Sequence, residues 1–90
     1  MKRRLRALKL DALVLVVWLD SAFASNGWTL VAERRNPRAV KIATAGWVVR
    51  RRKQSVTIAQ NVGGLDRQGG PQICNQITIP LGCILETKRL

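Results

Sequence analysis

The sequence contains no histidine and no tyrosine, and it has only five carboxylate side chains among 90 residues. Histidine is the commonest general base and metal ligand. A zinc site needs four good ligands, whereas this chain offers two cysteines, Cys74 and Cys83. The glycine pairs at 63–64 and 69–70 are not followed by the residues of a phosphate-binding loop. These absences predict a protein that is not an enzyme and uses no cofactor, metal or small-molecule substrate.

Aromatic residues are also scarce, since the chain has three tryptophans and one phenylalanine. A single domain of this length buries only about 60–65% of its unfolded surface. Its core is therefore thin and must consist mainly of valine, isoleucine and leucine. We expect Trp18, Trp28 and Trp47 to fill volume in this core. The alternative role, a base-stacking platform, needs an exposed ring beside cations, and Trp47 is the candidate because a basic run follows it.

Positive charge, by contrast, is abundant, because 16 lysines and arginines give a net charge of +11. A small domain this basic attracts polyanions such as nucleic acid, an anionic membrane surface or an acidic protein. The cations form three clusters, although each cluster alone is also compatible with a solvated face. One lies in the first nine residues, one comprises Arg34, Arg35, Arg38 and Lys41, and one is the run at 50–53. We predict that nucleic-acid phosphates contact Arg3, Arg4, Arg6, Lys9, Arg50, Arg51, Arg52 and Lys53, with Trp47 beside the last four.

Residues 12–19 are uninterruptedly apolar, and this run has two interpretations. It is far shorter than the about 20 residues that cross a bilayer, so we expect no transmembrane segment. A basic head before it and Ala22–Ala24 after it match a secretory signal peptide cleaved after Ala24. Its β-branched valines, and Asp11 and Asp20 on either side, favour a buried first strand. We prefer the strand, with the export signal as the alternative.

The remaining elements follow from periodicity and turn residues. Residues 28–35 are compatible with one or two helical turns that end before Pro37. Residues 47–60 predict a hairpin with a cationic tip, in which Trp47 and Val49 share a face. Residues 61–72 predict a flexible loop. Ile73, Ile77 and Ile79 then predict an inward-facing strand face, before a tight turn at 81–82 and a closing strand from Cys83 to Leu90.

The cysteines bear on the compartment. If the last two strands lie side by side, Cys74 is near the far end of the closing strand and Cys83 is near the turn. At about 3.3 Å per residue, their separation exceeds the ~7 Å that a disulfide spans. The sequence therefore disfavours a disulfide and predicts a reducing compartment, the cytoplasm of a bacterial host.

Several short segments, taken in order, resemble a family of small proteins of bacteriophages and phage-rich genomes. They are Val17–Ser21 (VWLDS), Gly27–Trp28 (GW), Ala45–Val49 (AGWVV), Thr57–Ala59 (TIA) and Ile77–Ile84 (ITIPLGCI). The last of these is similar to the end of Sm-like small barrels. The resemblance, over residues 16–90, implies a barrel-like β fold and a phage or bacterial origin, and it implies no activity. The basic head and the uniformly cationic hairpin tip depart from the family pattern.

Together these patterns predict a mainly all-β fold, a small five-stranded Sm-like barrel with a short helical turn. We expect a basic arm over residues 1–11, helical or disordered, and a single domain over residues 12–90. The leading hypothesis is a basic, non-enzymatic protein that binds nucleic acid non-specifically, as a homo-oligomer. The alternatives are a structural, oligomerisation or virion-associated protein and an exported domain with a cleaved signal.

Overall fold

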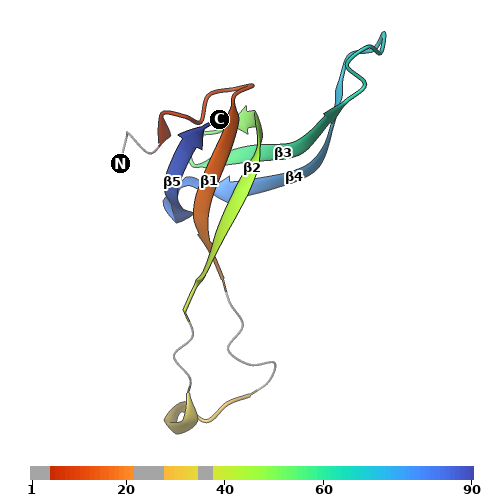
Figure 1. The fold of residues 1–90 in the computed structure, drawn as a ribbon. Helices are drawn as coiled ribbons and strands as arrows, with labels where there is room; N and C mark the ends of the chain where they lie inside the picture. The colour runs from red at the N-terminus through yellow and green to blue at the C-terminus, as the bar shows by residue number, and fades with distance from the viewer. Residues whose placement is uncertain (1–4, 22–27, 35–37) are drawn as a thin grey trace.

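The computed structural model describes residues 5–21, 28–34 and 38–90. Five antiparallel strands form one sheet in the order β4-β3-β2-β1-β5 (Figure 1). The strands are β1 (Leu13–Asp20), β2 (Val40–Arg51), β3 (Ser55–Gly63), β4 (Gln72–Pro80) and β5 (Ile84–Arg89), and two 3-10 turns are η1 (Val31–Glu33) and η2 (Leu81–Cys83). The mainly β prediction is confirmed. The sheet is open, because β4 and β5 form its two edges and do not pair with each other.

The apolar run at 12–19 forms β1, which lies between β2 and β5. Its side chains alternate, so that Val14, Val16 and Trp18 are buried while the residues between them are less buried. The Trp18 indole donates a hydrogen bond from Nε1 to Thr44 Oγ1 on β2, at 3.0 Å. The strand interpretation of this run is therefore confirmed, and the described part of the chain has no helix long and apolar enough to cross a membrane.

Strand β2 begins earlier than the sequence suggests, because residues 40–47 pair along the whole of β1. The pairing of β2 with β3 shifts register between Val48 and Arg50, so Val49 is an extra residue in β2 at this point. Val48 is fully buried, whereas Trp47 and Val49 on either side of it are both half-buried. This alternation agrees with the prediction that Trp47 and Val49 share a face, and the bulge interrupts the strand only after Val48.

Strands β3 and β4 form a long ribbon that leaves the rest of the sheet (Figure 1). Residues 61–63 and Gln72, predicted as loop, belong to this ribbon, and the loop itself is residues 64–71. Ile79 is fully buried and Ile77 partly so, but Ile73 is 41% exposed. The prediction that Ile73 points inward is wrong because it pairs with Val62, in the part of β3 that extends beyond β2 and the core. Asn75, at φ 58°, separates the two halves of the strand.

The chain end departs from the predicted hairpin. Pro80 ends β4, η2 turns the chain, and β5 pairs with β1 rather than with β4. Both cysteines are free, Cys74 on β4 and Cys83 in η2. The premise that their two strands lie side by side was wrong, because η2 carries the chain from one edge of the sheet to the other.

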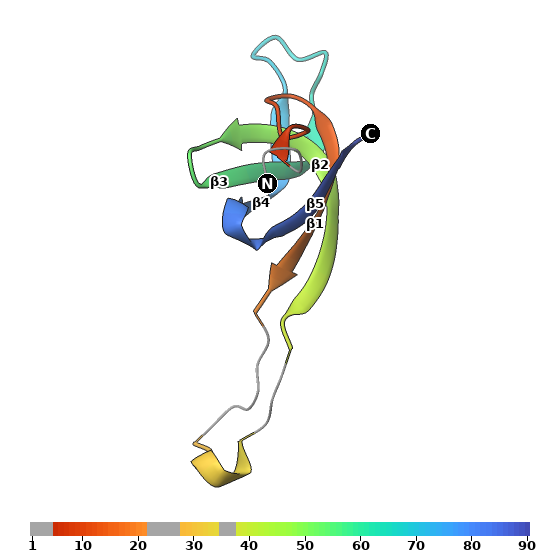
Figure 2. The same cartoon turned by 90° about the vertical axis from the view of Figure 1, so that its left-hand side faces the viewer.

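The buried core is small and lies where the sheet bends (Figure 2). It contains Leu8 and Ala12 from before β1, with valines, isoleucines and Trp18 from the strands. The β1–β2 and β3–β4 ribbons extend beyond it, so the molecule measures 60 × 29 × 21 Å. Its radius of gyration is 16.9 Å, compared with about 12 Å for a compact chain of this length.

Candidate nucleic-acid interface

The turn between β2 and β3 presents the third cationic cluster. The strands end at Arg51 and resume at Ser55, so the loop has three residues. The Arg52 amide closes the turn on the Ser55 carbonyl oxygen at 2.9 Å. All four cations of this cluster are exposed: Arg50, Arg51, Arg52 and Lys53. The nearest carboxylates in the sequence are Glu33 and Asp66, so the tip holds no acidic residue of its own.

A pocket of about 460 Å³ lies beside this tip. Its position depends on η2, because the Leu81 amide donates to the Gln54 carbonyl oxygen at 2.9 Å. The pocket combines apolar side chains, one side-chain amide and two cations: Leu5, Arg51, Lys53, Gln54, Pro80, Leu81 and Gly82 line it. A flat apolar group that carries a negative charge matches this lining, since the apolar part can pack on leucine and proline while the anion meets the cations.

The described part of the basic N-terminal segment, from Leu5 onward, reaches the same region. Leu5 packs against the core and lines the pocket, and the Leu8 amide donates to the Leu5 carbonyl oxygen at 3.1 Å. Arg6 and Lys9 are exposed on this segment. Arg3 and Arg4, also predicted as phosphate contacts, lie outside the described residues. The structure therefore brings residue 5 to the cationic tip, although 46 positions separate it from Arg51 (51 − 5).

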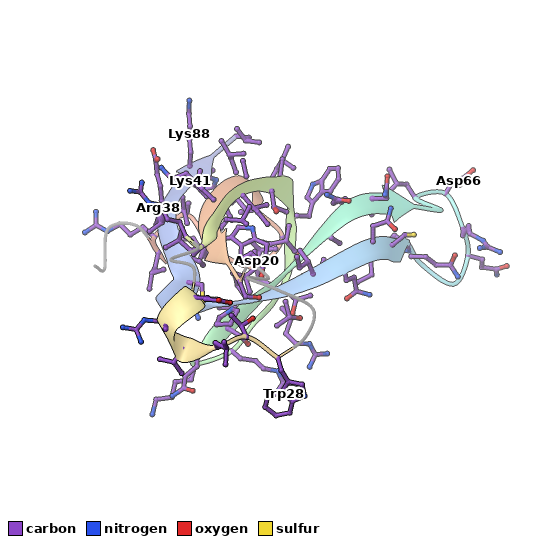
Figure 3. All side chains as sticks on the ribbon, turned by 90° about the horizontal axis from the view of Figure 1, so that it is seen from below. Asp20, Trp28, Arg38, Lys41, Asp66 and Lys88 are labelled. Carbon is purple, nitrogen blue, oxygen red and sulfur yellow. The ribbon has the colours of Figure 1, made fainter. Side chains whose placement is uncertain are left out.

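The three tryptophans differ in burial, and only one of them is a core residue as predicted. Trp18 is a core residue, 7% exposed, as expected. Trp47 is half-buried, so the candidate stacking ring beside the tip is not freely accessible. Trp28, predicted to fill the core, is instead fully exposed at 106%, and Figure 3 shows its ring projecting away from the ribbon. The Asn26-Gly27 turn signal before Trp28 was the one local indication that its segment leaves the core.

The second cationic cluster lies on the β1–β2 connection. Arg34 follows η1, while Arg38 and Lys41 flank the start of β2, and all three are exposed. Arg35 lies outside the described residues. Strand β2 therefore carries cations at both its ends, with Arg38 and Lys41 at the first and the tip cluster at the second.

The described residues hold no group of three or more Cys, Asp or Glu side chains that could bind a metal ion. Comparisons with protein-family models, with curated proteins and with solved structures find no match to this chain.

Proposed function

We propose that this chain is a small non-enzymatic protein that binds nucleic acid non-specifically through phosphate contacts. The cationic tip carries the proposal, because four adjacent exposed cations have no carboxylate in their stretch of sequence. Phosphate contacts of this kind supply affinity and orientation without reading base sequence. The adjoining pocket adds apolar side chains to the same surface, and one base can pack against them.

The bacteriophage origin and the Sm-like barrel class belong to the same proposal. Strand β4, the turn η2 and strand β5 follow one another as strand, tight turn and strand, which supports the barrel class. A cytoplasmic location is supported by the place of β1 between β2 and β5. Cleavage after Ala24 would remove this strand and with it Val14, Val16 and Trp18 from the core.

The test is the salt dependence of binding to a 20-nucleotide oligomer. With four to six phosphate contacts, affinity should fall roughly 10²- to 10³-fold between 50 and 200 mM salt. Arg52→Gln should make the dependence shallower by about one contact. Arg67→Gln is the matched control, since Arg67 is an exposed arginine on the β3–β4 loop, away from the tip. Binding that does not respond to salt, or equal effects of the two variants, would contradict the proposal.

A second candidate, association of copies through a sheet edge, is favoured by one observation. Residues 54–85, which include β3 and β4, contain only two charged side chains, Asp66 and Arg67, of opposite sign. Edge strands that avoid association usually carry charges, as β5 does with Glu86, Lys88 and Arg89. If β4 joins copies into an oligomer or onto a virion component, light scattering should show assemblies that Gln76→Lys dissociates. A strict monomer that still binds the oligomer would count against this candidate.

A further inference from the structure

Trp28 stands out because a large aromatic side chain is expected to be buried at least in part. It is fully exposed, at 106%, in the connection between β1 and β2. Its neighbours Leu30 and Val31 are exposed at 69% and 70%. A base-stacking residue requires an exposed ring with cations nearby, and Trp28 meets the first condition where Trp47 does not.

Exposed cations follow Trp28 along the chain, although Figure 3 shows the Arg38 and Lys41 side chains apart from the Trp28 ring. Arg34 ends η1, three residues after Val31, and Arg38 and Lys41 are next along the described chain. Glu33 is the one carboxylate between Trp28 and Lys41. A negatively charged partner that extends from the ring along residues 28–34 and 38–41 therefore meets more positive than negative side chains.

The two basic regions lie at opposite ends of one strand. Strand β2 has 12 residues, so at about 3.3 Å per residue its two ends are separated by up to about 36 Å. Residues 28–34, which include η1, lie away from the body that carries the cationic tip (Figure 2). A flexible polyanion can follow both regions, whereas a flat bilayer at the end of this connection contacts only one of them.

We propose that Trp28 is a base-stacking residue and that the nucleic acid bound by this protein is single-stranded. This inference rests on the proposed function and adds the class of ligand to it. Single strands present the faces of their bases to an aromatic ring, while a duplex keeps its bases stacked inside and exposes them only when one is flipped out. Phosphates farther along the bound strand then contact Arg34 and Arg38 on the same connection.

Tryptophan emission and binding affinity test this inference on the full chain. A dT20 oligomer should quench the emission of the exposed Trp28, and a 20-base-pair duplex should not. Trp28→Ala should abolish this quenching and weaken dT20 binding about 5- to 150-fold, while Trp28→Phe, which keeps a flat ring, should lose less. Because Trp28 is fully exposed, Trp28→Ala should unfold at the same temperature as the unchanged protein.

Leu30→Ala is the matched control, since it removes a neighbouring exposed apolar side chain that cannot stack. It should leave dT20 affinity unchanged. If salt-dependent dT20 binding survives Trp28→Ala at full strength, the stacking role is wrong and the proposed function stands. If neither the dT20 oligomer nor the duplex binds, the stacking role and the proposed function are both wrong. An equal loss with Leu30→Ala, or a blue shift of emission on phosphatidylcholine–phosphatidylglycerol vesicles without quenching by dT20, would identify an apolar anchor and overturn the inference.

Discussion

The hydrogen bond from Trp18 to Thr44 joins two buried side chains on neighbouring strands. Thr44→Val keeps the shape of the side chain but removes the acceptor, so the buried indole N–H loses its partner. An unsatisfied buried donor costs about 1–3 kcal/mol, and we expect the free energy of unfolding in urea to fall by this amount. Thr44→Ser retains the hydroxyl and is the control. Equal unfolding midpoints for the two variants would show that the bond contributes nothing.

Gly46 is required by a close approach of two strands. A Cβ atom at this position would meet the carbonyl oxygen of Ala59 and lie 2.7 Å from Ile58 Cγ2. Gly46→Ala should therefore destabilise the protein by about 1–3 kcal/mol or more, because β3 must move away from β2. Gly82→Ala serves as the comparison, since nothing lies within 4 Å of its added Cβ. Thermal unfolding should separate the variants, and a stable Gly46→Ala protein would contradict the observed packing.

Strand β4 consists of two halves that differ in what covers them. Ile79 is fully buried beneath the bent sheet, and Ile73, on the outer half of the β3–β4 ribbon, is 41% exposed. Ile79→Ala should cost about 2–5 kcal/mol because it leaves a cavity, while Ile73→Ala should cost less than about 1 kcal/mol. Chemical denaturation of both variants measures the difference. Similar losses would mean that the outer half of the strand is buried as well.

Screening of the positive charge by salt should have opposite effects on the stability of the free protein and on its affinity for nucleic acid. With a net charge of +11, the positively charged side chains repel one another in the folded state. This repulsion acts over longer distances at low salt, because the screening length is about 10 Å at 0.1 M and about 30 Å at 0.01 M. Raising sodium chloride from 10 to 200 mM should therefore raise the unfolding temperature of the free protein. The same change should weaken oligonucleotide binding. A fall of both quantities would show that self-repulsion does not limit stability.

The sequence alone determined the secondary structure class and the chemistry of the surface. Alternating apolar residues and β-branched runs predict strands because the side-chain period of a strand is two, and this pattern located β1, β3 and the inner half of β4. The hairpin tip was predicted because a run of cations between two such patterns has no place in a core. Residues 40–46 were missed as strand because their alanines and Gly46 have low strand propensity, although Val40, Ile42 and Thr44 alternate with the period of a strand.

Only the tertiary structure decided which segments meet. The chain end was predicted to fold back on β4, whereas β5 lies beside β1, because the buried contacts of Ile79 and Ile84 in one core require the sheet to bend. The same bend brings Leu5, the tip and η2 around one pocket. The exposure of Trp28 likewise depends on where the β1–β2 connection runs. Local patterns report the period of one element, whereas contacts between residues far apart in the chain depend on how all strands share a small core.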